Sequence, residues 1–570
     1  MAFRHVDLLR PQSRSATVQD SIAIAIAVIL SLVWYAPQLG FYSDDWAFLA
    51  RYVTTPDQTL SGFYQASHSP QHASRPVQLW VCAALYWMFG LNPGGHQLIT
   101  ALLVISNALL VYAVAILLRL PRPMALAVAL LYGTLPNYST NRYWFVAVAI
   151  TLSMTTCLVS IYAEIRAMTS PVRIGLAWKL LGAVALVVSS LAYEVAMPLL
   201  LVAPAGIACW VWRHHPGHAR RQLLYFALLV AINVVLLAGL SAFKVRTTVR
   251  LGAEHGLRAQ VVDIARRAVR RDLDRREYGL NGVNAARVHF RDYGVLLPVN
   301  ALRLARHAPA AVLVLTLVFG ILTCAYLAAT LDGSRWPVPR QWAGLLLGGI
   351  VVFALGYAIF LTNYNVQFTT TGIANRTAIV ATLGAAMGIA GGLGWLIAYV
   401  RSARARSLTF AGLVAVYAGG GFLCVNAIAN YWIEADGAER RILGDIRQRF
   451  PTLAPESALI LDGVCPYIGP AIVFEADWDL AGALQVMYGD STLKANVLTP
   501  RFRLEADALS FSIYGQWTKY PYSSRLLVYT PRTGELHPIT DRKAAEAYFG
   551  KALAAWSCPP GHEGIGVEVF

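Results

Sequence analysis

Two adjacent carboxylates, Asp44 and Asp45, follow the first long apolar segment of the chain, in the sequence Phe41-Tyr-Ser-Asp-Asp-Trp46. Burying an ionised carboxylate costs several kcal/mol unless it is paired or ligated. One carboxylate can accept the proton of a hydroxyl, while a second raises its pKa, orients a substrate or helps to hold a divalent cation. The alternative is that Asp44 caps the following helix and Asp45 faces water, because Ser-Asp-Asp suits a helix N-terminus.

Arginines form the second group of candidates, because a guanidinium binds two phosphate oxygens at once. Arg376 ends the polar run 363–376, which also contains the substrate-binding candidate Tyr364. Arg142 is a weaker candidate of the same kind, and Arg75 is placed to pair with the acids or with a phosphate. Each of these arginines also suits a simpler role as an anchor in the lipid head groups.

Three further polar residues accompany these groups. Glu194 lies between two apolar runs, at a depth that would let it meet the acid pair, or else in a solvated turn. His96 is a substrate-binding candidate, although His96 and Asn107 are better explained by hydrogen bonds between helices. A site built from Asp44, Asp45 and Glu194 would admit a divalent cation, but no feature of the sequence requires a cofactor.

The elements that must position these residues are membrane helices. The 570 residues are 57% hydrophobic and 14% charged, with a mean hydropathy of +0.51, which excludes an ordinary soluble protein. Apolar runs of near membrane-spanning length predict a polytopic α-helical protein with about eleven transmembrane helices. The expected spans are 19–38, 96–118, 124–136, 143–165, 179–193, 195–212, 223–242, 308–330, 342–361, 377–400 and 408–428.

The net charge of +16 is distributed as expected for a membrane protein rather than for a nucleic-acid-binding protein. Arginines fill alternate short connections between the spans, which is the positive-inside pattern. This pattern puts the N-terminus in the cytoplasm and Asp44-Asp45 outside, in a bacterial inner membrane. No cleavage site follows the first apolar run, so we expect a retained helix rather than a signal peptide.

Two long outer loops, 39–95 and 243–307, interrupt the predicted membrane domain 1–428. The first contains the apolar run 77–91, which is too short to span and is expected to lie along the outer surface. The second contains the segment 257–273, whose apolar stripe and four arginines predict a basic amphipathic helix. That helix would bind anionic lipids or form an ordinary solvated loop helix.

Residues 429–570 predict a small, mixed α/β domain outside the membrane. Ala458–Asp462 and Leu526–Tyr529 have the character of short buried strands, and Pro531–Gly534 that of a turn into another strand. The domain offers no motif with evident chemistry. Cys465 and Cys558 both lie in it, and an oxidising compartment would permit, but does not require, a disulfide between them.

The first 205 residues resemble the GT-C superfamily of polyprenyl-phosphate-sugar-dependent glycosyltransferases, and most closely the protein O-mannosyltransferase (family 39-like) branch. The resemblance is carried by the order and spacing of short elements: Phe41–Trp46, Ser74-Arg-Pro-Val77, Phe89–His96, Asn107–Tyr112, Leu135-Pro-Asn-Tyr138 and Ala192-Tyr-Glu-Val-Ala-Met-Pro198. In such families one carboxylate of the pair is the base. The resemblance therefore implies Asp44 as base with Asp45 as partner, or the reverse.

The leading hypothesis is thus an integral membrane glycosyltransferase that moves a sugar from a polyprenyl-phosphate donor to an acceptor hydroxyl on the extracytoplasmic side. The acceptor would be a glycan, a lipid or a protein. A transporter or flippase for lipid-linked or anionic substrates is the alternative, although such proteins usually place ionisable groups near the bilayer midplane. A non-catalytic scaffold that displays the C-terminal domain is a third reading.

Overall fold

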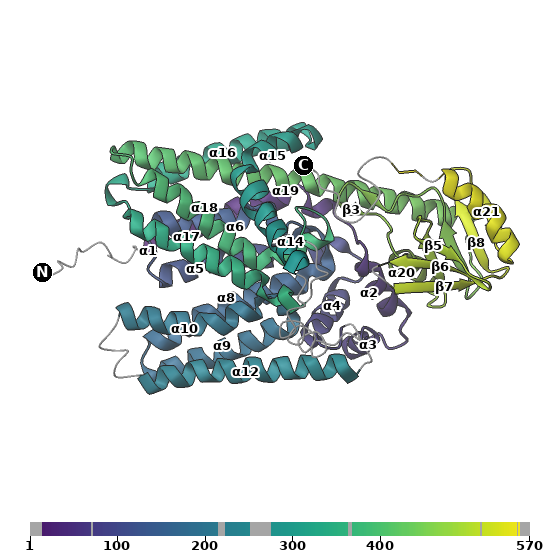
Figure 1. The fold of residues 1–570 in the computed structure, drawn as a ribbon, viewed down its shortest axis with the longest axis horizontal. Coiled ribbons are helices and arrows are strands. Elements are labelled where there is room, and N and C mark those ends of the chain that lie inside the picture. Colours follow the sequence, from purple (N-terminus) through teal and green to yellow (C-terminus); the bar gives the residue numbers. More distant parts are fainter. Residues whose placement is uncertain are drawn as a thin grey trace, which may run out of the picture.

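The computed structural model describes residues 14–69, 72–214, 223–250, 275–362, 368–513, 516–555 and 557–558. A large bundle of helices is joined at one end to a smaller domain that contains all the described strands (Figure 1). The two parts have the architecture that the sequence predicts, a polytopic helical region followed by a small α/β domain.

Ten helices of the described chain are long and apolar enough to cross a membrane. They contain α1 (Arg14–Val33), α5 (Pro93–Leu117), α8 (Val148–Thr169), α9 (Val172–Ala192), α10 (Met197–His214), α12 (Leu223–Arg250), α16 (Ala310–Thr330), α17 (Pro339–Ala358), α18 (Ile379–Ile397) and α19 (Ala403–Arg449). The predicted span 124–136 forms α6 (Arg122–Thr134), whose 13 residues are almost all buried among other helices. Its apolar sequence therefore reflects burial within the protein, and it is too short to cross a bilayer alone.

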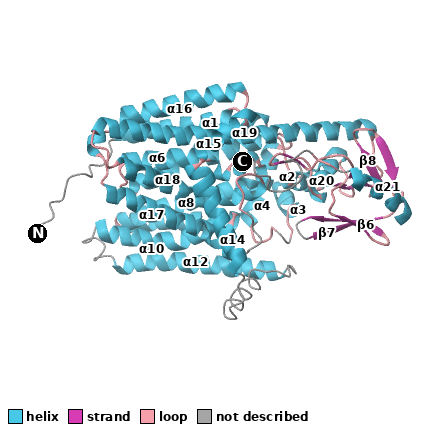
Figure 2. Cartoon of the chain, turned by 45° about the horizontal axis from the view of Figure 1, so that its top comes forward, coloured by secondary structure: helices cyan, strands magenta, loops and turns pink. Residues whose placement is uncertain are grey.

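The first outer loop folds into short helices at the end of the bundle that faces the C-terminal domain (Figure 2). These are α2 (Asp44–Thr54), α3 (Leu60–Ala66) and α4 (Pro76–Phe89). The expected surface helix corresponds to α4, which buries Leu79, Cys82 and Leu85 and exposes Trp80 and Trp87. Exposed tryptophans of this kind suit a membrane–water interface.

The second outer loop is also helical where it is described. It contains α14 (Arg275–Ala286), the nine-residue π-helical segment η5 (Arg287–Val295) and α15 (Leu297–Leu304). The predicted basic helix 257–273 lies outside the described residues. Helix α12 continues to Arg250, beyond the predicted end of its span at residue 242, because Ser241–Arg250 contains no glycine or proline that would stop it.

Helix α19 runs from the far end of the bundle into the C-terminal domain without interruption (Figure 1). Its 47 residues extend over about 70 Å at 1.5 Å per residue. The predicted boundary at residue 428 therefore falls inside a continuous helix. Hydropathy drops there, but Ala, Glu, Arg and Leu continue to favour helix as far as Arg449.

The C-terminal domain is built on a four-stranded sheet in the order β4-β1-β8-β9. Strand β1 pairs in parallel with β4 and β8, and β8 pairs antiparallel with β9. The predicted strands 458–462 and 526–529 are β1 and β8, and the predicted turn leads into β9. The strands are β1 (Ala458–Leu461), β2 (Tyr467–Ile468), β3 (Ala471–Ile472), β4 (Lys494–Val497), β5 (Phe502–Leu504), β6 (Ala508–Ile513), β7 (Gln516–Pro521), β8 (Leu526–Thr530) and β9 (Glu535–Pro538).

Two helices and a disulfide complete this domain. Helix α20 (Asp477–Tyr488) faces the bundle, and α21 (Arg542–Ala555) covers the outer side. Cys465 and Cys558, whose pairing the sequence left open, form a disulfide. The buried core is continuous from the bundle through α2 and α20 to the sheet, so the domain is packed onto the membrane region rather than tethered to it.

Candidate active site

The acid pair lies at the start of α2, behind a strained turn. Ser43 has φ +48° and ψ −120°, a backbone conformation that is costly for a residue with a side chain, by about 1–3 kcal/mol. Buried contacts hold the turn on both sides: the Tyr42 hydroxyl donates to the Trp432 carbonyl (2.8 Å) and the Trp144 indole donates to the Tyr42 carbonyl (3.0 Å). The fold therefore fixes the direction in which the next residue, Asp44, leaves the turn.

Asp45 is fully buried and its carboxylate is used by the backbone. Its Oδ2 accepts the amide of Tyr42 and its Oδ1 accepts the amide of Val146, both at 2.9 Å. These bonds tie the α2 turn to η3 (Phe145–Ala147). Burial raises the pKa of Asp45 well above its ordinary value, and the two amides oppose that shift only in part. The side chain thus supports the turn and has no exposed surface.

Asp44 is half-buried and interacts with side chains from three elements. Burial raises the pKa of its carboxyl above the ordinary value. The Arg376 guanidinium, the Trp478 side chain and the Arg51 guanidinium act in the opposite direction. The pair is therefore divided between two environments: one carboxylate is locked by amides, and the other faces cations at the boundary between the bundle and the C-terminal domain.

The C-terminal domain contributes directly to this site. The Ser43 hydroxyl donates to Glu475 Oε1 (3.2 Å), which places the segment before α20 against the strained turn. Asp479 caps that segment by accepting the amides of Glu475 (2.7 Å) and Ala476 (3.2 Å). Sequence analysis found no chemistry in this domain and missed Trp478 and Glu475. The signal was present in the run Glu475-Ala-Asp-Trp-Asp479, an acidic and aromatic cluster like that of Asp44-Asp45-Trp46.

Arg376 lies in η9 (Ile373–Ala378), directly before α18. Its guanidinium lies over the Trp144 ring, 5.1 Å from the centroid, and its Nη1 donates to the Ile373 carbonyl (2.7 Å). These two contacts orient the fork while its charge acts on Asp44. The arginine that the sequence selected therefore does lie beside the acid pair. Tyr364, from the same run, lies outside the described residues.

Arg75 and Glu194 come together with each other rather than with the acid pair. The Arg75 guanidinium makes a two-pronged ion pair with the Glu194 carboxylate and lies over the Tyr193 ring, 4.1 Å from its centroid. Lys244 of α12 also contacts Glu194 (3.4 Å) and donates to the Ser74 carbonyl (2.9 Å). Glu194 was expected to meet Asp44 and Asp45, but it pairs instead with Arg75 and Lys244 in a cluster of net charge +1.

Two other sequence candidates are buried. His96 is packed among Phe41, Phe89 and Phe145, and its Nε2 lies 3.0 Å from the Gly90 carbonyl. Arg142 is 1% exposed and donates to the Gly133 carbonyl (2.7 Å). Both side chains are turned into the protein. Their role in substrate binding stays a prediction.

Arg142 and Asn107 instead connect helices. The Arg142 guanidinium lies 5.0 Å from the centre of the Tyr138 ring and contacts Ser31 of α1. Asn107 of α5 donates to the Thr151 carbonyl of α8, as the simpler interpretation of that residue expects. Within the described part of the chain, no group of three or more His, Cys, Asp or Glu side chains could hold a metal ion. The arrangement of Asp44, Asp45 and Glu194 that would admit a cation is therefore not formed.

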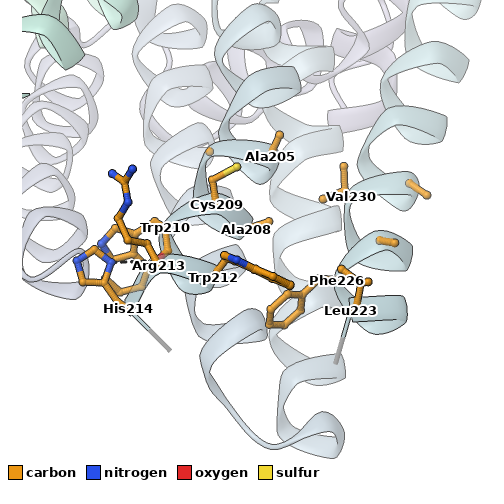
Figure 3. A pocket seen from close by; sticks show the side chains of 13 residues that line it. Ala205, Ala208, Cys209, Trp210, Trp212, Arg213, His214, Leu223, Phe226 and Val230 are labelled. Carbon is orange, nitrogen blue, oxygen red and sulfur yellow. Dashed lines mark hydrogen bonds between the residues drawn. The ribbon is translucent and has the colours of Figure 1, made fainter. Parts of the chain in front are cut away.

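One cavity lies far from these residues. It occupies about 980 Å³ between α10 and α12, at the end of the bundle opposite the C-terminal domain. Figure 3 shows Trp212 of α10 pointing toward Leu223 and Phe226 of α12, with Trp210, Arg213 and His214 grouped on the other side of α10. Its lining is mainly apolar and carries no carboxylate, so it lacks the groups for the chemistry of the acid pair.

Comparison with known proteins gives little further guidance. No family model matches the chain, and no curated protein does. Among solved structures, the chain resembles apo ArnT from Cupriavidus metallidurans, with 16% identity and a TM-score of 0.39 over 83% of this chain and 85% of that one. The same protein bound to undecaprenyl phosphate gives 15% identity and a TM-score of 0.35 over 84% and 90%. Both likenesses are weak, and neither supports the function proposed below.

Proposed function

We propose that this chain is an integral membrane glycosyltransferase that uses a polyprenyl-phosphate-linked sugar and acts at the end of the bundle where the C-terminal domain docks. One observation carries the proposal: the two adjacent acids have different environments. Both carboxylate oxygens of Asp45 accept hydrogen bonds from backbone amides. Asp44 is half-buried and interacts with Arg376 and Trp478. A carboxylate that is not held by backbone amides and lies beside an oriented guanidinium is what a transfer from phosphate to a hydroxyl requires.

Asp44 acts as the general base in this proposal. The acceptor oxygen attacks the anomeric carbon of the sugar and passes its proton to the Asp44 carboxylate, while the bond from that carbon to the phosphate oxygen breaks. The electron pair leaves with the polyprenyl phosphate, and the configuration at the anomeric carbon inverts. Burial raises the pKa of Asp44, which brings it closer to neutral pH and makes it a stronger base than an exposed aspartate.

Arg376 binds the phosphate that departs. Its position over Trp144 and its bond to the Ile373 carbonyl fix the plane of the guanidinium, so little orientation is lost when it binds two phosphate oxygens. The Arg75–Lys244–Glu194 cluster is a second cationic surface at the same end of the bundle, and its net positive charge suits a lipid phosphate that approaches along the membrane.

The disulfide supports an extracytoplasmic site. Cys465 and Cys558 belong to the domain that docks on α2, and disulfides persist in oxidising compartments. The arginine pattern of the short connections independently puts the same end of the bundle outside. A lipid-linked donor suits this location, because nucleotide sugars are not available there.

The test is transfer of radiolabelled sugar from a panel of polyprenyl-phosphate donors, with the purified protein in proteoliposomes. Asp44→Asn keeps the size of the side chain but cannot act as a base, so we expect transfer to fall by roughly 10²–10⁴-fold. Asp332→Asn is the matched control: it removes the same charge from an exposed connection between α16 and α17 and should transfer normally.

If the wild-type protein transfers no sugar from any donor but moves lipid-linked sugars across the vesicle membrane, the glycosyltransferase proposal is wrong and the protein is a flippase. One feature favours that second candidate, because Glu164 and Lys179 form an ion pair within membrane-spanning helices. The pair is closed, however: Lys179 Nζ lies 2.8 Å from both Glu164 Oε2 and Asn233 Oδ1, and both charged side chains are buried. These contacts hold α8, α9 and α12 together.

A further inference from the structure

A second cavity, of about 290 Å³, lies where the C-terminal domain meets the first outer loop. We refer to it as the α2–α20 cavity, because residues of α2 and α20 line it together with residues of β4 and β7. Figures 1 and 2 both show α2 beside α20. Its lining residues are Ala47, Arg51, Asp477, Trp478, Ala481, Gly482, Gln485, Leu493, Lys494, Ala495, Thr518 and Tyr520.

The cavity and the proposed base share two neighbouring residues. Asp44, Ala47 and Arg51 are spaced by three and four residues on α2, so they share one face of the helix. Two residues that line the cavity, Arg51 and Trp478, also interact with the Asp44 carboxylate. The seven helical steps from Asp44 to Arg51 cover about 10 Å along the helix axis. A molecule in the cavity would therefore lie beside Ala47 and Arg51, on the face of α2 that also carries Asp44.

The lining chemistry indicates what such a molecule carries. Trp478 offers aromatic surface. Gln485 offers its Oε1 as a hydrogen-bond acceptor, because its Nε2 already donates to the carbonyls of Ser491 (3.2 Å) and Leu493 (2.8 Å). Asp477 accepts a hydrogen bond from the Thr518 hydroxyl (3.0 Å). The lining carries two cations, Arg51 and Lys494, and one carboxylate, Asp477. Arg51 also acts on the Asp44 carboxylate, so Lys494 is the cation that neither acid of α2 offsets.

We propose that the α2–α20 cavity binds the acceptor, and that the acceptor is a glycan bearing a carboxylate or phosphate group. Arg51 and Lys494 bind that anion at one end of the cavity, while the hydroxyl to be glycosylated lies at Asp44. Arginine and lysine recognise both anions through charge-assisted hydrogen bonds. This assignment rests on the proposed function for its acceptor role, but the binding of an anionic sugar can be measured without it.

The experiment is ligand-observed saturation-transfer NMR on the full-length protein in nanodiscs, with three probes: methyl glucoside, glucuronate and glucose 6-phosphate. We expect both anionic sugars to bind and the neutral one to bind at least tenfold more weakly. Lys494→Ala and Arg51→Ala should each weaken the anionic probes roughly tenfold. Lys543→Ala removes an exposed lysine from α21 of the same domain and should change nothing.

The carboxylate and the phosphate probe identify which anion the cavity prefers, and binding of either one supports the proposal. Equal binding of all three sugars would overturn it, and so would anionic binding that both Lys494→Ala and Arg51→Ala leave intact. Arg51 is close to Asp44, so Lys494→Ala gives the cleaner result if Arg51→Ala fails to fold. Anionic binding without sugar transfer from any donor would retain the cavity as a binding site and reject the glycosyltransferase. Sugar transfer without selective binding of the anionic probes would retain the glycosyltransferase and reject the cavity as a site for an anionic acceptor.

Discussion

Gly482 of α20 lies against the peptide group of Trp46 in α2, so closely that a Cβ on the glycine would stand 2.6 Å from the Trp46 carbonyl carbon and oxygen. The two helices therefore meet backbone to backbone at this point. This contact brings Trp478, one turn before Gly482, to the Asp44 carboxylate. Because Gly482 has no side chain, α20 can approach α2 closely enough for the C-terminal domain to reach the acid pair.

Gly482→Ala is expected to force α20 away from α2, because the atoms in its way are backbone atoms that cannot rotate aside. Overpacking of this kind costs about 1–3 kcal/mol, so the melting temperature of the purified protein should fall, and sugar transfer should fall with it. Gly444→Ala in α19 is the matched control: nothing lies within 4 Å of its added Cβ. That variant should melt at the wild-type temperature or above, since alanine favours helix.

Sugar transfer should be lost as the pH falls through the pKa of Asp44, because the base must be ionised. Burial raises this pKa, so the acidic limb of the kcat profile should lie above the ordinary aspartate value of about 3.9. Arg51→Ala removes a charge that lowers the pKa of Asp44 and should move the limb to higher pH. An acidic limb at or below the ordinary value would contradict the assignment of Asp44 as a buried base.

Asp44→Asn should be inactive and yet at least as stable as the wild type. A carboxyl whose pKa is raised in the folded state binds more protons there than in the unfolded chain, so its contribution to the free energy of unfolding falls as the pH rises through that window. Asparagine does not titrate, and the advantage of the variant should grow as the pH rises from the ordinary aspartate pKa of about 3.9 through the raised pKa of Asp44 in the folded protein. Melting curves at several pH values measure this, and a variant that is less stable at neutral pH would refute it.

Asp45→Ala should behave in the opposite way to changes at Asp44 and mainly destabilise the fold. It leaves the buried amides of Tyr42 and Val146 without their acceptor, at about 1–3 kcal/mol for each. We expect a clear drop in melting temperature and in the amount of folded protein, with Asp44→Ala as the comparison of equal size. Normal stability of Asp45→Ala together with lost transfer would assign the catalytic role to Asp45 instead.

The Glu164–Lys179 pair should matter for folding rather than for transfer. Either single change, Glu164→Gln or Lys179→Met, leaves a buried charge without its partner, which costs about 3–5 kcal/mol. The double variant removes both charges and should recover most of the lost stability. Melting temperatures of the four proteins form the cycle that measures this. Loss of transfer in a double variant of normal stability would indicate a functional ion pair.

The sequence predicted those features that depend on local pattern. The strand at Ala458 and the short helix after Arg75 are found within a residue or two, because runs of apolar residues and a helix-starting proline are local signals. Helix α6 shows the limit of this approach: its 13 mostly apolar residues are consistent with a buried helix as well as with part of a membrane span, and hydropathy does not distinguish the two.

Partners distant in sequence could not be predicted in the same way. Arg75 and Glu194 were both selected, but their pairing across 119 residues follows from how α4 packs beside the α9–α10 turn. The same holds for Asp44 and Asp45, which are equivalent in the sequence. The two acids differ only in what packs beside them. Asp45 accepts a backbone amide from η3, whereas Asp44 interacts with Trp478 of α20.

The uninterrupted helix α19 sets an angle as well as a length. Because it has no break between the bundle and the domain, one residue inserted after Ile433 would rotate everything beyond it by about 100° and advance it by about 1.5 Å. Glu439 would then turn away from the Trp46 indole, which now donates to it at 2.9 Å. Insertions of seven residues, close to two full turns, preserve the direction in which the domain faces. The orientation of the domain toward Asp44 is therefore encoded in the residue count of a helix.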